Sequence, residues 1–237
     1  MKYSEGLKFT SNNDGTCTIK SIGTCKDRNI KIPPTSPEGE IAIKIEDWAF
    51  ANCKSDSITI PNSVQEIGDM AFACSDILKM NIPNSVTRIG DSAFVDCNYL
   101  HSIIISNSVT EIGNSVFAGC KRLTTITIPD SVTKIGESAF SACSGLSSII
   151  ISKNITKIEE ETFNECVSLE KIDIPRGVIV IGAYAFYNCI KLQKINIPDG
   201  VSTVALNAFA GCEGLKEIFM PKTVTTITGS DSPDFKF

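Results

Sequence analysis

Ten cysteines and one histidine are the residues of this chain that could most readily do chemistry. Thiolates bind zinc and attack electrophiles, and metal sites usually place them in close pairs such as C-x-x-C with cysteine or histidine partners. Eight of the cysteines are instead spaced 21 or 23 residues apart: Cys53, Cys74, Cys97, Cys120, Cys143, Cys166, Cys189 and Cys212. We therefore predict no metal site and interpret them as small buried hydrophobic side chains, which free cysteine commonly is.

Disulfides are the second chemistry open to these thiols. Equivalent cysteines of neighbouring repeats would have parallel Cα–Cβ bonds, whereas a disulfide brings its two Cβ atoms to about 3.8 Å. We do not expect bridges among the eight. Cys17 and Cys25 differ, because they flank TIKSIGT near the N-terminus and could close a hairpin-like loop. That bridge requires an oxidising compartment, so both the free and the bridged forms remain open.

Catalysis finds little support in the remaining polar residues. His101 follows an inward-facing Leu100, and no motif places a serine or cysteine nucleophile beside it. The run Glu159-Glu160-Glu161 is typical of a solvated turn, since paired-carboxylate catalysis needs a second carboxyl group across a cleft. Glycine-rich phosphate loops and EF-hand patterns are absent from the sequence. We predict no catalytic residue, no cofactor and no enzyme activity.

The cysteines belong to a repeat that must position every other side chain. Each follows a phenylalanine, and the phenylalanines recur every 22 or 23 residues: Phe50, Phe72, Phe94, Phe117, Phe140, Phe163, Phe186 and Phe209. A period in this range is the signature of stacked coils in a solenoid. Stacking joins equivalent strands into a parallel sheet with about 4.8 Å between neighbours, and aligned apolar residues then form continuous internal columns.

One complete coil is Leu123–Cys143, LTTITIPDSVTKIGESAFSAC. Its I-x-I segment alternates apolar and polar residues, as a strand with one buried face does. Pro129 ends that strand, because proline cannot donate to a ladder, and Val132 and Ile135 then point inward again. The A-F-x-x-C segment places inward residues three apart, which favours a short helical or 3₁₀ piece.

The pattern I-P-x-S-V-T-x-I-G-x-x-A-F-x-x-C resembles the BspA-type bacterial leucine-rich repeat over about residues 45–224. The resemblance implies a right-handed solenoid with a parallel β-sheet on the concave face and short helical, 3₁₀ or irregular segments on the convex face. It also implies surface or secreted roles in adhesion, without catalysis. The opening GLKFTSNNDGTCTIKSIGTC resembles the N-terminal cap of that family. We predict a cap of short strands at 1–44, a solenoid at 45–222 and a tail at 223–237, all in one elongated domain.

Specificity is expected on the concave face, where strand alternation sends two side chains per coil outward. The candidate binding residues are Ile104, Thr127, Ile150, Lys171, Asp173, Lys194, Asn196, Glu217 and Phe219. Outward aliphatic and aromatic side chains on a rigid sheet make good anchors for a partner. Two other readings stay open: isolated apolar surface residues are common, and Phe219 could pack beneath the C-terminal tail.

Composition limits the partners further. The net charge is −5, and no run of lysine or arginine exceeds two residues, so a nucleic-acid partner is not expected. No apolar run reaches the roughly 18 residues of a membrane span, and the start MKYSEGLKF lacks the apolar core of a signal peptide. We expect a non-enzymatic, monomeric module, at the cell surface or secreted, that binds a protein or glycan. The alternative is a cytoplasmic protein–protein interaction scaffold.

Overall fold

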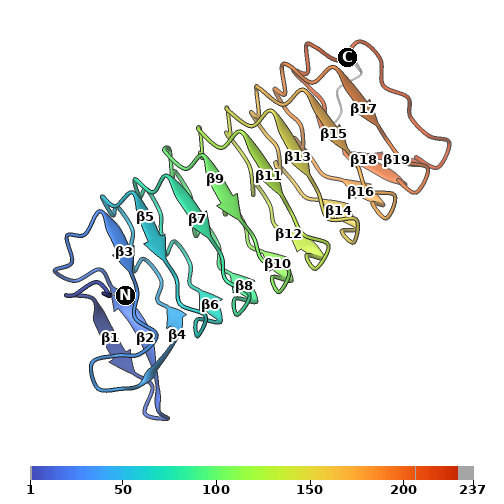
Figure 1. The fold of residues 1–237 in the computed structure, drawn as a ribbon. Coiled ribbons are helices and arrows are strands. Elements are labelled where there is room, and N and C mark those ends of the chain that lie inside the picture. The colour runs from blue at the N-terminus through green and yellow to red at the C-terminus, as the bar shows by residue number, and fades with distance from the viewer. Residues whose placement is uncertain (1, 206, 229–237) are drawn as a thin grey trace.

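The computed structural model describes residues 2–205 and 207–228, which stack as successive coils along one axis (Figure 1). The chain advances by one coil with each repeat, from the N-terminal end of the body to the C-terminal end. The predicted fold class is confirmed: the molecule is a parallel β-solenoid of about eight turns. Each coil has three sides, two of them formed by short strands and the third by turns.

The first side carries the I-x-I strands, and its outward surface is called the front face below. Hydrophobic alternation explains these strands, because the middle residue of each is buried while its neighbours face outward. The front strands are β3 (Asn29–Lys31), β5 (Ser57–Thr59), β7 (Lys79–Asn81), β9 (Ser102–Ile104), β11 (Thr125–Thr127), β13 (Ser148–Ile150), β15 (Lys171–Asp173) and β17 (Lys194–Asn196). They form two four-stranded parallel ladders, β3-β5-β7-β9 and β11-β13-β15-β17.

The second side begins with the N-terminal hairpin. Strand β1 (Lys8–Ser11) pairs antiparallel with β2 (Thr16–Ser21), and β2 pairs parallel with β4 (Ile41–Ile45). The strands that continue this side are β6 (Glu66–Ile67), β8 (Arg88–Ile89), β10 (Glu111–Ile112), β12 (Lys134–Ile135), β14 (Lys157–Ile158), β16 (Val180–Ile181), β18 (Thr203–Ala205) and β19 (Thr226–Thr228). Strand β3 and all but the last residue of β4 lie inside the predicted cap, so both strand-bearing sides begin before residue 45.

The third side is built from turns, and the helical or 3₁₀ alternative for A-F-x-x-C is wrong in the described residues. Ser138 and Ala142 have φ angles of 54° and 55°, which a right-handed helix excludes. The amides of Ser138, Phe140 and Ala142 donate to carbonyl groups of the following coil at 2.9, 2.9 and 2.7 Å. Bonds between coils therefore add to the short-range bonds within each turn.

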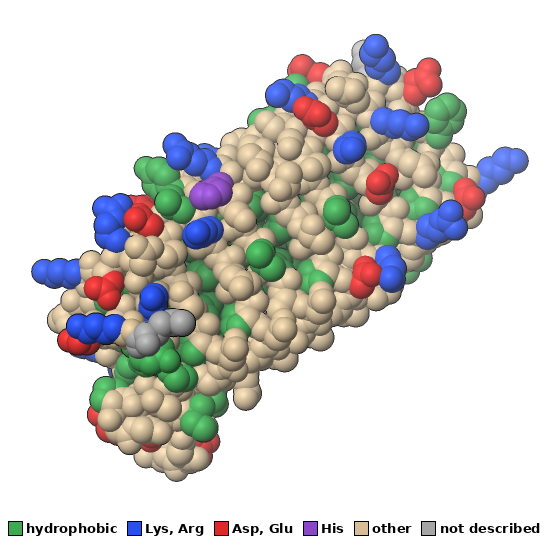
Figure 2. Space-filling view, viewed as in Figure 1, with side chains coloured by type: hydrophobic (Ala, Val, Ile, Leu, Met, Phe, Trp, Pro, Cys, Tyr) green, Lys and Arg blue, Asp and Glu red, His purple; other side chains and the backbone are tan. Residues whose placement is uncertain are grey.

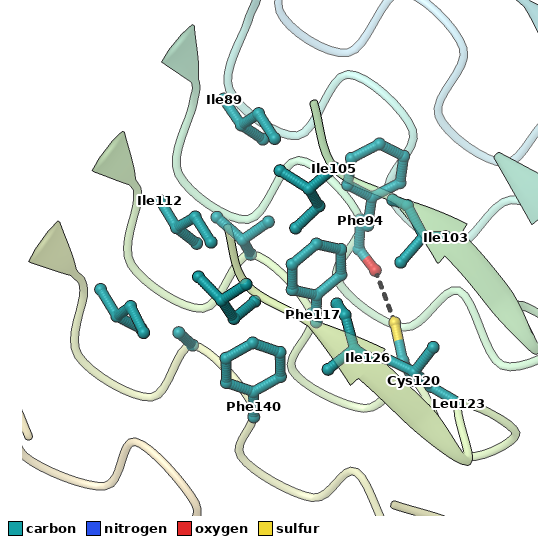
Figure 3. Packing of buried hydrophobic residues seen from close by; sticks show 14 of the residues in the cluster. Ile89, Phe94, Ile103, Ile105, Ile112, Phe117, Cys120, Leu123, Ile126 and Phe140 are labelled. Atoms are coloured by element: carbon teal, nitrogen blue, oxygen red, sulfur yellow. Dashed lines mark hydrogen bonds between the residues drawn. The ribbon is translucent and has the colours of Figure 1, made fainter. Parts of the chain in front are cut away.

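The core consists of side-chain columns that run the length of the stack. The eight repeat phenylalanines stack with nearly parallel rings, with ring centroids 5.0 to 5.6 Å apart and interplanar angles of 5° to 18°. Figure 3 shows Phe94, Phe117 and Phe140 in successive coils, with isoleucines of both strand sides around them. Offset stacking of this kind stabilises beyond the burial of apolar area alone.

Candidate binding face

The front face presents two columns of outward side chains, as the strand alternation predicted. From β5 to β17, the first column consists of Ser57, Lys79, Ser102, Thr125, Ser148, Lys171 and Lys194. The second consists of Thr59, Asn81, Ile104, Thr127, Ile150, Asp173 and Asn196. Strand pairing sets residues of one column side by side, for example Asn81 with Ile104 and Thr127 with Ile150. The structure thus brings together seven of the nine candidate binding residues.

Glu217 and Phe219 lie at the same place in the repeat, but no strand forms there. Phe219 is 80% exposed, so the described residues do not cover it. The C-terminal tail on which the packing alternative depends, including Phe235, lies outside the described residues. Strand β17 is therefore the last front strand in the described part of the chain.

The middle of the front face is uncharged. Ile104 and Ile150 are 62% and 65% exposed, and Thr127 of β11 lies between them. Figure 2 shows this side of the molecule with scattered hydrophobic side chains among uncharged polar groups, and with charged side chains toward its edges and ends. The charged strands that follow carry Lys171 and Asp173. The face thus has a neutral centre and a charged C-terminal part.

Two open depressions lie on or beside this face between β5 and β17. One, of about 570 Å³, is lined by residues of β5, β7 and β9, including Ile104, and by the Pro-Asn segment after β7. The other, of about 540 Å³, is lined by polar residues that include Asp173, Arg176 and Asp199. Neither is an enclosed cavity that would shield reacting groups from water. Their form suits contact with a surface better than burial of a small substrate.

Serine replaces the usual proline after the two strands that carry Ile104 and Ile150. Ser152 Oγ donates to the Val132 carbonyl at 2.6 Å, which joins its turn to the preceding coil. Lys153 Nζ lies 2.7 Å from Asp130 Oδ2, and Asn154 Nδ2 donates to the Asp130 carbonyl at 2.7 Å. No ladder pairs β12 with β14, so the second side is interrupted between these two coils. Side-chain bonds from Ser152, Lys153 and Asn154 connect the same two coils at this turn.

The repeat cysteines have a specific structural task in addition to filling space. Cys120 Sγ donates to the carbonyl of Phe94 in the preceding coil at 3.2 Å (Figure 3), and the pattern continues along the stack. Burial raises the pKa of the Cys143 thiol to about 12. It also raises the pKa of Cys97 to about 11. These thiols stay protonated at neutral pH and are poor nucleophiles.

Cys74 does not belong to this column, and the sequence prediction that it does is wrong. Its φ angle is 56° and its side chain is exposed, while Ser75 is fully buried at the inward position. The Ser75 amide donates to the Phe72 carbonyl at 3.2 Å, as the Cys97 amide does to Phe94. The F-x-x-S spacing could have identified Ser75, since the inward residue follows the repeat phenylalanine by three positions in every coil.

The N-terminal cysteines are unbridged. Cys17 lies in β2 and its thiol contacts the Glu40 carbonyl at 3.4 Å, and Cys25 is buried after the following turn. Both thiols are free in the structure, and their bridging in an oxidising compartment stays a prediction. The two residues do not close a hairpin, because β2 pairs with β1 and β4 instead.

The other suggestive side chains do not converge. His101 is exposed just before β9, and the Glu159 carboxylate pairs with Lys157 on the second side. Ser138 Oγ donates to Glu161 at 3.0 Å. Within residues 2–205 and 207–228, no three His, Cys, Asp or Glu side chains gather in a way that could hold a metal ion. No helix in this part of the chain is long and apolar enough to cross a membrane.

Comparisons with known proteins agree with this architecture. Residues 23–147 and 143–231 match the family described as "BspA type leucine rich repeat region", in six copies. A leucine-rich cell surface protein of Faecalibacterium prausnitzii is 23% identical with a TM-score of 0.52, covering 97% of this chain and 96% of its own. The pneumococcal vaccine antigen PcpA is 18% identical with a TM-score of 0.65, covering 94% and 70%. A leucine-rich repeat protein of Eubacterium ventriosum is 22% identical with a TM-score of 0.60, covering 85% and 65%. These structures share the fold, and a search of curated proteins gives no match.

Proposed function

Because the chain belongs to the BspA-type leucine-rich repeat family, we propose that it is a non-catalytic protein-binding module that holds its partner on the front face. The solenoid supplies a rigid surface of repeated strands, and the family's repeats are typical of binding scaffolds. The partner would contact the uncharged centre first and the charged C-terminal strands around it.

One observation carries this proposal: Ile104 and Ile150 are more than 60% exposed on the front strands β9 and β13, two coils apart. Exposed aliphatic side chains that flank one another are the kind of anchor that protein partners desolvate on binding. A protein fits better than a glycan, because sugar-binding surfaces rely on aromatic rings and these two columns contain none.

Display at the cell surface or secretion is the second part of the proposal. It is supported by the description of the Faecalibacterium protein as a cell surface protein and of the pneumococcal protein as a vaccine antigen. The exposed, free Cys74 favours the alternative of an intracellular scaffold, because exposed thiols persist best in reducing compartments. Antibody labelling of intact against permeabilised cells decides between the two locations. Labelling only after permeabilisation would refute surface display.

Site-specific crosslinking tests the binding face. A benzophenone amino acid at position 127 should capture a partner, whereas the same group at position 134, on the second side, should not. Changing both Ile104 and Ile150 to Asp should abolish capture from position 127 while leaving the circular dichroism spectrum unchanged. Equal capture from positions 127 and 134, or capture that survives the double change, would contradict the proposal.

A further inference from the structure

We propose that the front face binds an uncharged polyproline II segment of a partner protein, flanked by acidic residues and lying along the solenoid axis. This inference rests on the proposed function, since it names the partner segment for the same face. It follows from three features of the two outward columns: the spacing of the isoleucines, the free hydroxyl groups beside them, and the lysines that end the neutral centre.

The spacing of Ile104 and Ile150 suits a polyproline II helix. They lie two coils apart, with Thr127 between them: β11 and β13 pair as parallel strands, and β9 packs beside β11 without a ladder between the two. At about 4.8 Å per coil, the two side chains are separated by about 10 Å. A polyproline II helix rises 3.1 Å per residue and has three residues per turn, so residues i and i+3 face the same side about 9.3 Å apart. Same-side residues of an extended strand are only about 6.6 Å apart, which does not match.

The hydroxyl groups of the first column distinguish this segment from an α-helix, whose two-turn repeat of about 10.8 Å would also reach both isoleucines. Ser102, Thr125 and Ser148 lie in the first column, one on each of the strands β9, β11 and β13, beside the residues of the second column. No hydrogen bond joins their hydroxyls to another group in the described residues, whereas Ser57 of the same column donates to Asn29 at 2.7 Å. A polyproline II backbone has no internal hydrogen bonds and offers its carbonyl groups to such donors, while the carbonyl groups along a helix are already bonded.

Lysines mark both ends of the neutral centre. Lys79 and Lys171 are exposed in the first column, four strands apart, which corresponds to about 19 Å. Six residues of polyproline II span nearly the same distance. Acidic residues six positions apart in the partner segment would therefore face the two lysines, while its apolar residues face Ile104 and Ile150 of the second column. Asp173, beside Lys171 in the second column, makes the attraction weaker at that end.

The capped peptide ELPPLPE meets all of these conditions, and fluorescence anisotropy of its labelled form measures binding. Its leucines are three positions apart, and its glutamates are six apart on a different side of the helix. The peptide ELPLPPE has the same composition with leucines two positions apart, so it is the matched control. We expect ELPPLPE to bind at least fivefold more tightly than ELPLPPE at low salt, and more tightly than the lysine-flanked KLPPLPK. Equal affinity for ELPPLPE and ELPLPPE would overturn the inference.

Protein variants locate the binding. Ile104→Ser and Ile150→Ser should each weaken ELPPLPE binding about fivefold, while Ile179→Ser should not, although Ile179 is also 51% exposed. Lys79→Gln should weaken binding and reduce its dependence on salt, in contrast to Lys134→Gln on the second side. If position 127 still captures a protein partner but ELPPLPE neither binds nor competes, the face is a binding site for another kind of segment and this inference is wrong. If capture fails as well, the proposed function falls with it.

Discussion

The inward and outward side chains of the front strands come from the same three-residue segments but vary in opposite ways along the stack. The inward residue is isoleucine in every front strand except β7, where it is Met80. The outward residues change from serine and threonine to isoleucine, lysine and aspartate within a few coils. Inward residues must match the coils above and below, because each column is packed to the density of a protein interior. Outward residues meet only solvent, so they are free to specify a partner.

Truncation in the phenylalanine column should have the largest effect on stability. Phe140 is fully buried between Phe117 and Phe163, with ring centroids 5.4 and 5.6 Å away. Phe140→Ala should lower the free energy of unfolding by about 3–5 kcal/mol, as buried phenylalanine truncations do. Urea denaturation measures it, and Phe219→Ala is the control, because an exposed phenylalanine should change stability little. Similar losses for both variants would remove the distinction between inward and outward positions.

Alkaline pH should weaken the core through its buried thiols. The pKa values of Cys97 and Cys143 are raised to about 11 and about 12 in the folded protein, from 9.0 in an unperturbed thiol. The folded state therefore holds these protons while the unfolded state loses them. Stability should be constant below about pH 8 and fall from pH 9 upward, with a slope of at most about 1.4 kcal/mol per pH unit for each thiol. Denaturation at several pH values measures the slope. Stability that is unchanged up to pH 11 would contradict these pKa shifts.

Removal of a column thiol should have an intermediate effect. Cys143 Sγ donates to the Phe117 carbonyl at 3.0 Å in a fully buried site. Cys143→Ala should cost about 1–3 kcal/mol, because it leaves a small void and removes a donor from a buried carbonyl. Cys74→Ala, at the exposed position, should cost less. Thermal unfolding of the two variants under reducing conditions compares them, and a larger loss at Cys74 would reverse our assignment of the column.

The smallest effect on stability is expected where the effect on binding is largest. Ile104→Ser and Ile150→Ser remove exposed side chains that contact little of the protein, so each should change the free energy of unfolding by no more than about 0.5 kcal/mol. The same denaturation experiment measures this change. A loss above about 1 kcal/mol would show that these isoleucines stabilise the fold. Their exposure would then no longer be evidence that they bind a partner.

The strands were the part of the fold most open to prediction. The alternation of apolar and polar residues identified the front strands and their outward residues, because a period of two admits one arrangement of the two faces. The turn side was not open to the same reasoning. A-F-x-x-C places inward residues three apart in a 3₁₀ helix and in linked turns alike, and hydrogen bonds to the next coil favour the turns. Cys74 was misplaced because residue type was followed in place of the spacing from phenylalanine.

The repeat period and the alternation within it determined the solenoid, its register and the candidate residues of the front face, because burial of aligned apolar columns leaves few other folds. The tertiary structure decided how close those residues lie and which polar groups are already bonded. It placed Ile104 and Ile150 on either side of Thr127, left the hydroxyls beside them free, and bonded the cysteine thiols to phenylalanine carbonyls. These relations join residues of different coils. They depend on how one coil packs against the next, and the sequence of a single coil does not specify that packing.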